Sequence, residues 1–463
     1  MAQYSKNYED FLPQQKTNFE VVMIADNFGN LTPGTGGTAA DAFGRLRVAE
    51  PFTLGDYKHL YAIDPNFLDK TENGGTITFN VDKAVATLAT SSNPAARAVH
   101  QTKFYHHYQP GKSQLIFSSI AFGNAQQNVT KRTGYFDDRD GIYFEQVGSN
   151  TSDGTDQGTL NFVIRSHTSG SASETDVGDY KRRVPQSEWN IDPCDGTGPS
   201  KFNLDITKTQ LVYIDFQWLG VGRVRCGFVH NGQIVLAHEY YHSNVLDEVY
   251  MSNPNLPVRC EIRNTGTTAG GSMDQVCATV MSEGGYVESG IDWAVTTGAA
   301  RTTTTPGGTR FPLLAIRLKN TFQSYPNRIT VRPNTLGLFA SGNDCYYELV
   351  KVADASQLTT TLNSGVLTWT DTDTNSGVEY CINAQAITGA VDVMATGIAT
   401  AGTSQNSMTP VASGLLTSAK KNIIVQNIDS TDSEVFIIAI KTISTAGNAT
   451  ANGACTLQWR EIY

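Results

Sequence analysis

The sequence contains few charged residues: Lys, Arg, Asp and Glu make up 17% of the chain, against about 25% in a typical globular protein. The formal net charge is −10, and the longest basic run is the triplet Lys181, Arg182 and Arg183. Because phosphate binding needs clustered Lys and Arg, we expect no nucleic-acid partner. The triplet is expected to lie in a solvated loop.

Cysteine is also sparse, with 7 residues in 463 and no Cys-x-x-Cys pair. The count is odd and the spacings are wide and irregular, which does not fit a disulfide framework or a zinc site. We therefore expect reduced, mostly buried thiols. The sequence predicts no metal and no cofactor.

Long apolar runs and helical periodicity are missing as well. No run of about 18 apolar residues occurs, so we expect no membrane-spanning segment. Residues 1–10 are polar, and the apolar region of a signal peptide does not follow them. We therefore expect a protein made in the cytoplasm of a host cell.

What the chain has in abundance is apolar–polar alternation with a period of two, the pattern of half-buried β-strands. Alternate apolar residues of 212–218 fall on one face of a strand. The pair Asn231-Gly232, a strong hairpin signal, then leads into a returning strand. Residues 212–237 therefore predict a three-stranded antiparallel meander, and a second hairpin is predicted to turn at Asp140-Gly141.

Repeated short strands with turn signals every 8–12 residues or so are typical of a β-sandwich or jelly roll. We predict an all-β protein with an extended N-terminal assembly arm (1–42), a large antiparallel jelly-roll β-sandwich (43–294) and a smaller C-terminal β-sandwich-like domain (310–463). Residues 295–309, rich in Thr and Gly, are predicted to link the two domains. The stretch 389–409, rich in Ala, Gly, Ser and Thr, is predicted to be loop.

Residues 238–242 read His-Glu-Tyr-Tyr-His and match the pattern of zinc proteases. That pattern binds zinc when it lies on a helix, which places both imidazoles on one face. Here it continues a strand, in which positions four apart are separated by about 13 Å. One zinc ion cannot bridge that distance, so we predict a strand end with two polar histidines.

An acidic motif consists of Asp137, Asp138 and Asp140 before Gly141. The regular spacing of a calcium loop is missing, which favours a turn, with an adventitious calcium ion as the alternative. No Gly-x-Ser-x-Gly nucleophile elbow occurs either. We predict that the chain is not an enzyme.

Aromatic residues next to polar strand ends are the most promising candidates for a binding site. Tyr105 and Tyr108 flank a pair of histidines, and Tyr240 and Tyr241 precede another histidine. Such rings stack on sugars or anchor protein interfaces. The alternative is that these tyrosines are divided between the core and the rim of a sheet.

Several longer motifs carry a resemblance to a known family. They are Phe43–Leu54 (FGRLRVAEPFTL), Tyr108–Ser113 (YQPGKS), Gly134–Glu145 (GYFDDRDGIYFE), Trp189–Asp192 (WNID) and Asp215–Arg225 (DFQWLGVGRVR). Together they resemble a family of virion structural proteins of tailed bacteriophages, over roughly residues 41 to 290. The middle of the chain is also similar to a concanavalin-type jelly roll, a fold shared by lectins and by inert structural domains.

The resemblance implies a non-enzymatic particle component, located in the virion and associated with the tail, baseplate or fibre, or decorating the head. Its implied partners are other virion proteins and copies of itself, as a trimer or ring joined through the N-terminal arm and sheet edges. A receptor- or glycan-binding module at a tail or fibre tip, with a host-surface glycan as partner, is the alternative. A depolymerase acting on host polysaccharide is a third hypothesis, which we do not expect to hold.

Overall fold

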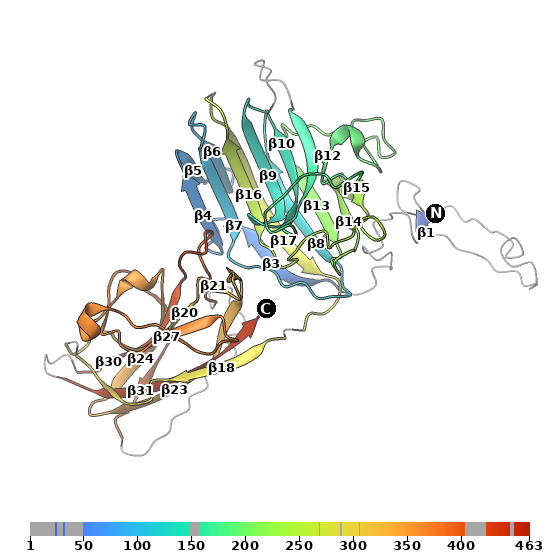
Figure 1. Cartoon of the computed structure of the whole chain (residues 1–463). Helices are drawn as coiled ribbons and strands as arrows, with labels where there is room; N and C mark the ends of the chain where they lie inside the picture. The colour runs from blue at the N-terminus through green and yellow to red at the C-terminus, as the bar shows by residue number, and fades with distance from the viewer. Residues whose placement is uncertain are drawn as a thin grey trace, which may run out of the picture. The chain divides into compact units, whose positions relative to one another are not determined.

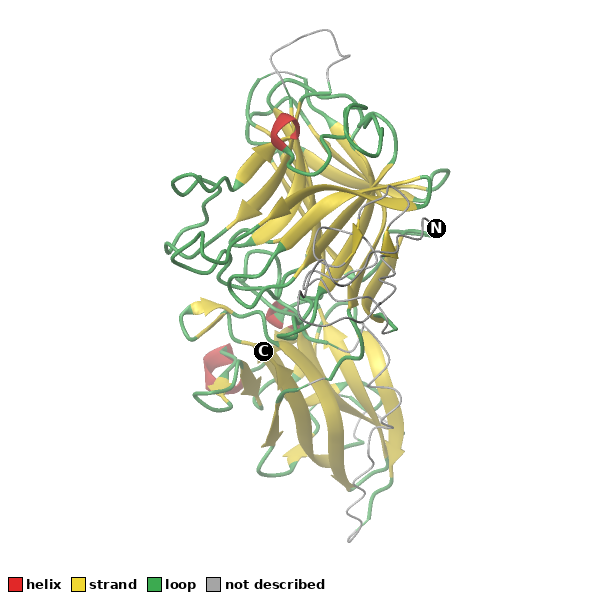
Figure 2. Ribbon diagram, turned by 90° about the vertical axis from the view of Figure 1, so that its right-hand side faces the viewer, coloured by secondary structure: helices red, strands yellow, loops and turns green. Residues whose placement is uncertain are grey.

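Strands dominate the computed structural model, which describes residues 24–25, 31–32, 50–148, 157–267, 269–287, 289–304, 306–402, 423–444 and 449–463. The chain divides into two compact units, residues 1–286 and 287–463 (Figure 1). The predicted arm, 1–42, lies outside the described residues except for two short strands, β1 (Ile24–Ala25) and β2 (Leu31–Thr32), which pair with each other. The prediction of an all-β fold is confirmed (Figure 2).

Two antiparallel sheets form the N-terminal unit. The seven-stranded sheet has the order β12 (Arg183–Pro185), β11 (Thr159–Arg165), β10 (Gly141–Val147), β9 (Val129–Phe136), β16 (Val258–Asn264), β7 (Arg97–Thr102) and β4 (Phe67–Glu72). The eight-stranded sheet has the order β15 (Gln233–Tyr240), β14 (Val224–His230), β13 (Gln210–Phe216), β8 (Gln114–Ala121), β17 (Ser272–Ser282), β6 (Val85–Thr90) and β5 (Gly75–Asn80), with β3 (Phe52–Lys58) also paired to β17.

The core of the sandwich lies between these two sheets. Phe144 of β10 and Phe228 of β14, which belong to different sheets, pack edge to face with ring centroids 5.2 Å apart. Tyr135 of β9 and Phe216 of β13 pack across the same layer at 5.5 Å. Strand alternation supplies one buried apolar face from each sheet, as expected for a two-layer sandwich.

Both predicted supersecondary units of this sandwich are confirmed. Strands β13, β14 and β15 form the antiparallel meander, and the β14–β15 turn is built on Asn231 (φ 50°) and Gly232 (φ 76°). Positive φ at both central positions gives the turn the twist that a two-residue hairpin requires. Strands β9 and β10 form the second hairpin, which turns at residues 137–140.

The C-terminal unit is built mainly on two further sheets. One contains β18 (Ile291–Thr296), β31 (Asn452–Ile462), β19 (Arg301–Thr302) and β23 (Thr330–Ser341), with β31 pairing to the other three. The other has the order β26 (Thr370–Asp371), β27 (Val378–Cys381), β20 (Phe311–Leu318), β30 (Val435–Thr442), β24 (Cys345–Val352) and β29 (Asp392–Ala399). Two-stranded pairs complete the unit: β21 (Thr321–Phe322) with β22 (Tyr325–Pro326), and β25 (Leu358–Thr359) with β28 (Ala386–Ile387).

Two sequence predictions about this unit are wrong. The predicted linker, 295–309, contains the end of β18 and all of β19, and both strands pair with β31. The unit therefore begins at Val287. The predicted loop, 389–409, contains β29; residues 403–409 lie outside the described part. The composition of β29 did not indicate a strand, because its small residues pack against larger side chains of the paired strand. Gly397, for example, lies opposite Tyr347, whose ring covers the glycine.

Helical structure is limited to short turns in the described residues, η2 (Gln186–Glu188), η3 (Ala355–Gln357) and η4 (Leu362–Gly365). No helix among these residues has the length and apolar character needed to cross a bilayer. All seven cysteines are free thiols; six are buried, and Cys277 on β17 is exposed.

Candidate functional site

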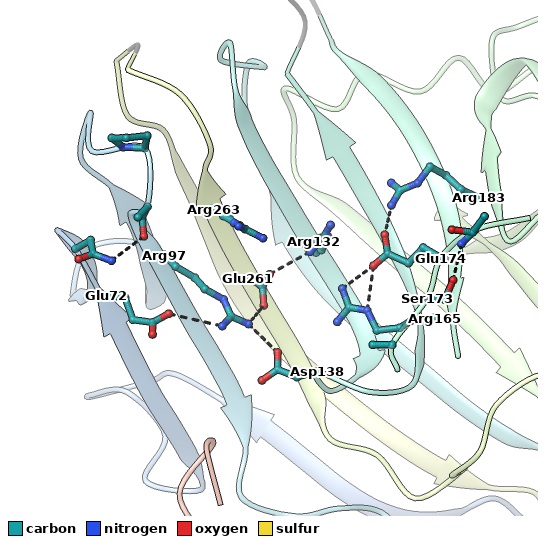
Figure 3. Close-up of a pocket in the computed structure, with 15 residues that line it drawn as sticks. Glu72, Arg97, Arg132, Asp138, Arg165, Ser173, Glu174, Arg183, Glu261 and Arg263 are labelled. Atoms are coloured by element: carbon teal, nitrogen blue, oxygen red, sulfur yellow. Dashed lines mark hydrogen bonds and ion pairs between the residues drawn. The ribbon is translucent and has the colours of Figure 1, made fainter. Parts of the chain in front are cut away.

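A polar cleft of about 920 Å³ lies on the seven-stranded sheet, on the face turned away from the sandwich core (Figure 3). We call it the arginine cleft. Its lining residues are Glu72, Asn73, Pro94, Ala95, Arg97, Arg132, Asp138, Arg165, Ala172, Ser173, Glu174, Thr175, Arg183, Glu261 and Arg263. Five arginines and four carboxylates among them make charge the dominant feature of this face.

Strand alternation explains why charges collect on this face. In β16, Arg259, Glu261 and Arg263 are separated by Cys260 and Ile262. The latter two residues belong to the sandwich core. Since successive side chains of a strand point to opposite faces, the three charged residues share the outer face, and β16 supplies the centre of the cleft.

A row of opposite charges crosses three neighbouring strands. Glu261 of β16 lies opposite Arg132 of β9, which in turn lies opposite Glu145 of β10. Arg132 donates from Nε to Glu145 Oε2 at 2.8 Å and from Nη1 to Glu261 Oε1 at 3.2 Å. Opposite charges in facing positions stabilise strand pairing, so this row also supports the register of the sheet.

Arg97 of β7 connects three carboxylates at one end of the cleft. Its Nη2 donates to Asp138 Oδ1 at 2.7 Å and to Glu261 Oε2 at 2.8 Å, and its Nη1 lies 3.6 Å from Glu72 Oε2. Burial by itself lowers the pKa of Arg97, but the attraction of Glu261 and Asp138 outweighs it and raises that pKa above its ordinary value. The guanidinium is therefore permanently charged.

Glu174 organises the other end, and it comes from a loop between β11 and β12. Arg165 Nη2 donates to Glu174 Oε1 at 2.7 Å, and Arg183 also forms an ion pair with Glu174. The Tyr143 hydroxyl donates to the same carboxylate. One loop carboxylate thus holds two arginines and a tyrosine of three different strands.

Aromatic rings form the floor of the cleft but are not accessible. Phe136, Tyr143 and Val163 are fully buried on this face. The Arg165 guanidinium lies over both rings, 5.6 Å from the Phe136 centroid and 5.2 Å from that of Tyr143. Cation–π contacts of this kind stabilise the arginine, and the covered rings leave no aromatic platform on which a sugar could stack.

The acidic groups of the cleft are held in the ionised state. Burial raises the pKa of Glu261, but Arg259, Arg97 and Arg132 together outweigh it and lower that pKa to about 2. The pKa values of Glu174 and Asp138 are likewise lowered, because neighbouring arginines outweigh the effect of burial. These three carboxylates accept hydrogen bonds and do not donate protons at neutral pH.

The tyrosines that the sequence singled out do not form a surface cluster. Tyr105, Tyr108 and Tyr240 are buried, at 6%, 9% and 3% exposure, and only Tyr241 is exposed, at 52%. Tyr108 packs on Phe216 in the sandwich core, with ring centroids 5.7 Å apart. The prediction of accessible rings is therefore wrong for three of the four residues, and the alternative that most are core residues is correct.

The His-Glu-Tyr-Tyr-His stretch is confirmed as a strand end. His238 Nδ1 accepts from the Asn190 backbone amide at 3.3 Å, whereas His242 Nε2 accepts from the Tyr180 hydroxyl, with 2.8 Å between the two atoms. Burial lowers the pKa of each imidazole to about 4. The described part of the chain contains no group of three or more His, Cys, Asp or Glu residues that could hold a metal ion.

Two charged motifs prove more important than their sequence suggested. The predicted turn is confirmed, because Asp137 Oδ1 accepts from the backbone amides of Arg139 and Asp140. Asp138, however, points into the cleft and binds Arg97. The Lys-Arg-Arg triplet is not a solvated loop throughout: Arg183 belongs to β12 and lines the cleft.

Comparison with protein-family models and with curated proteins finds no match. Similar solved structures include a protein of unknown function from Shewanella oneidensis (10% identity, TM-score 0.32, 56% of this chain and 100% of that chain covered). Peanut lectin is another, at 11% identity and a TM-score of 0.29, with 50% of this chain and 98% of the lectin covered. A third is a Bacteroides ovatus mixed linkage glucan GH16 in complex with a product, at 11% identity and a TM-score of 0.31, with 49% of this chain and 99% of that chain covered. At these TM-scores the similarities carry no argument, so the assignment of a β-sandwich rests on the strand pairing described above.

Proposed function

We propose that this chain is a non-enzymatic structural component of a tailed-phage virion. The positions of the family-like motif residues support the proposal. Residues 134–145 build the β9–β10 hairpin in the seven-stranded sheet, and Tyr135, Phe136 and Tyr143 within it are fully buried. The motif residues therefore serve to stabilise the β-sandwich, as expected in a protein with a structural role.

The non-enzymatic part of the proposal rests on the charges of the cleft. A glycoside hydrolase needs one carboxylic acid whose pKa is raised, so that it can protonate the leaving group. Glu174, Glu261 and Asp138 have lowered pKa values instead, each because of adjacent arginines. These three carboxylates are therefore not suited to act as that acid, which favours binding over cleavage.

Open sheet edges offer a route to assembly with other virion proteins or with copies of the chain. Among the described strands, β29 ends the order of its sheet, and it carries exposed apolar residues, including Val393 at 48% and Ile398 at 61%. An edge strand presents unpaired backbone groups that can accept a further strand. Pairing of this kind would join subunits into the trimer or ring that we propose.

The location is tested on intact particles. Mass spectrometry of gradient-purified virions should detect the chain at a fixed ratio to other virion proteins. Micrographs of particles labelled with an antibody to the chain should then place it at the tail, baseplate, fibre or head. Its absence from purified particles, together with abundance in the infected-cell lysate, would contradict a virion role.

Glycan binding by the arginine cleft is the second candidate function. The observation in its favour is a cleft lined by both guanidinium donors and carboxylate acceptors, which matches hydroxyl groups that donate and accept. A glycan array probed with the whole chain should show binding that Ala172→Trp abolishes by filling the cleft. Ala300→Trp, at an exposed position of the C-terminal unit, is the matched control and should bind normally.

A further inference from the structure

Arg263 is the one cleft arginine without an ion-pair partner among the described residues. It is exposed, lies near the end of β16 and lines the cleft. The other four arginines of the lining, Arg97, Arg132, Arg165 and Arg183, are each bound to carboxylates. In Figure 3, dashed lines connect these four to acidic side chains, and none reaches Arg263.

The register of the sheet places Arg263 beside another cation. Arg263 lies directly opposite Arg97 of β7, and facing side chains in such a pair have Cβ atoms about 5 Å apart. Like charges in facing positions are destabilising. On its other side, Arg263 faces Thr130 of β9, which carries no charge. An anion between the two guanidinium groups would remove this repulsion.

Unused hydrogen-bond donors point to the same place. The carboxylates Glu72, Asp138 and Glu261 occupy Nη1 and Nη2 of Arg97, while its Nε–H, shielded from solvent, has no acceptor. Arg263 adds five further N–H donors, arranged in the fork that matches a carboxylate or sulfate group. In the described part of the chain, N–H donors of both arginines are therefore left without an acceptor at this end of the cleft.

We propose that the Arg263 end of the arginine cleft binds the anionic group, a uronate carboxylate or a sulfate ester, of an acidic polysaccharide. This inference rests on the glycan-binding function proposed above and names its ligand class. Arg263 makes the direct contact with the anion, and the charge of Arg97 on the neighbouring strand adds to the attraction. The carboxylates farther along the cleft accept hydrogen bonds from the sugar hydroxyls.

The composition of the cleft favours a saccharide over other polyanions. A nucleic acid would bring one phosphate per nucleotide against Glu72, Asp138, Glu174 and Glu261, and against a chain whose net charge is −10. An acidic peptide would meet the same repulsion at every side chain. Each sugar of an acidic polysaccharide carries free hydroxyls beside its anionic group, so the anion can meet Arg263 while hydroxyls of the same sugar face the carboxylates.

Isothermal titration calorimetry on the whole chain provides the test. The probes are a galacturonate hexamer, a sulfated galactan hexamer and the methyl ester of the galacturonate hexamer, which keeps the sugar backbone and removes the charge. Wild type should bind at least one acidic hexamer, more weakly as salt rises, and should not bind the ester. Arg263→Gln should bind roughly tenfold more weakly, as expected for loss of a charge-assisted hydrogen-bond pair.

Lys208→Gln removes one exposed cation outside the cleft and is the matched control, expected to bind as wild type does. The inference would be overturned if wild type bound neither acidic hexamer, or bound the methyl ester equally well. It would also be overturned if Arg263→Gln kept wild-type affinity, or if wild type preferred duplex DNA or polyglutamate. Array binding of neutral glycans only, lost in Ala172→Trp, would overturn it while leaving glycan binding intact. Absence of any glycan binding would overturn both this inference and the proposed glycan-binding function, and would leave the virion proposal unaffected.

Discussion

Lys131 of β9 is a charged residue within the packed interior of the N-terminal unit. It has no exposed surface, and its Nζ donates to the carbonyl oxygens of Phe122 and Asn124, the latter at 2.8 Å. Burial lowers the pKa of Lys131 from 10.5 to about 7. In the folded protein this amine is therefore present in roughly equal proportions of its charged and neutral forms near pH 7.

The lowered pKa of Lys131 predicts a pH-dependent stability. Between about pH 7 and pH 10.5 the unfolded chain binds more protons at this amine than the folded chain does, so its contribution to the free energy of unfolding rises with pH. From pH 7 to pH 9, wild type should gain about 2 kcal/mol relative to Lys131→Met, at about 1.4 kcal/mol per pH unit. Urea unfolding at pH 7, 8 and 9 measures this difference, and parallel profiles would refute the prediction.

Glu261 makes a second pH-dependent contribution to stability, at acid pH. Its pKa in the folded state is about 2, below the ordinary value of 4.5, so its stabilisation is complete above about pH 4.5 and is lost as pH falls toward 2. Glu261→Gln leaves Arg97 and Arg132 partly unpaired and should cost about 3–5 kcal/mol at pH 7. In urea unfolding at pH 7, 5 and 3, the deficit of the variant should shrink at pH 3; a constant deficit would argue against the ion pairs as its source.

The alternation of charges in β16 was the available sequence signal for the cleft. Arg259, Glu261 and Arg263 occupy every second position, which predicts a charged sheet face. The partners of these residues could not be predicted, because Arg97 and Arg132 are 164 and 129 positions from Glu261 in sequence. Only the register of three non-sequential strands brings them together.

At the scale of elements, glycines opposite aromatic residues define the β9–β10 hairpin. Gly141 lies opposite Phe136, and Gly134 lies opposite Tyr143. A Cβ atom on Gly141 would come within 2.0 Å of Phe136 Cβ, and one on Gly134 within 2.6 Å of Tyr143 Cα. Each glycine thus leaves the space that lets the aromatic side chain opposite lie flat on the sheet.

Gly141→Ala should therefore destabilise the N-terminal unit by about 1–3 kcal/mol, the usual cost of overpacking. Gly285→Ala is the matched control, because nothing lies within 4 Å of the added Cβ. Thermal unfolding of both variants, followed by circular dichroism, tests the prediction. A melting temperature of Gly141→Ala equal to that of the control would contradict it.

Local sequence signals predicted the two hairpins of the N-terminal unit but did not predict strand β29 of the C-terminal unit. Asn231-Gly232 forms one turn, and Asp140-Gly141 marks the end of the other, at residues 137–140. Both lie beside alternating strands, so turn chemistry and side-chain period agree. Strand β29 (Asp392–Ala399) offers no such agreement, since mostly small or exposed residues compose it. Its pairing with β24 (Cys345–Val352) is a tertiary effect that overrides local propensity.

At the scale of the whole molecule, the described strands of residues 50–286 pair only with one another, and those of 287–463 do likewise. A fragment of residues 50–286 should therefore fold alone, with one cooperative unfolding transition and β-rich circular dichroism. Its partner strands and its sandwich core are all present in the fragment. Insoluble expression rescued by co-expression of 287–463 would count against independent folding.

The domain boundary shows what sequence composition cannot reveal. Residues 295–309 look like a linker because Thr and Gly dominate them, yet β18 and β19 there complete a sheet around β31, which ends the chain. A pairing between residues about 150 positions apart, such as Thr302 and Asn452, leaves no trace in local composition. The all-β class could be predicted from alternation alone, because that pattern is local.

The exposure of Cys277 has a practical consequence for locating the chain in a particle. A maleimide should modify each native chain at this one position, since the other six thiols are buried. Burial raises the pKa of the Cys277 thiol, so coupling should accelerate as pH rises and thiolate forms. A gold cluster attached there would mark the eight-stranded sheet in micrographs without any mutation, and protection from the reagent after assembly would reveal that a neighbour covers that face.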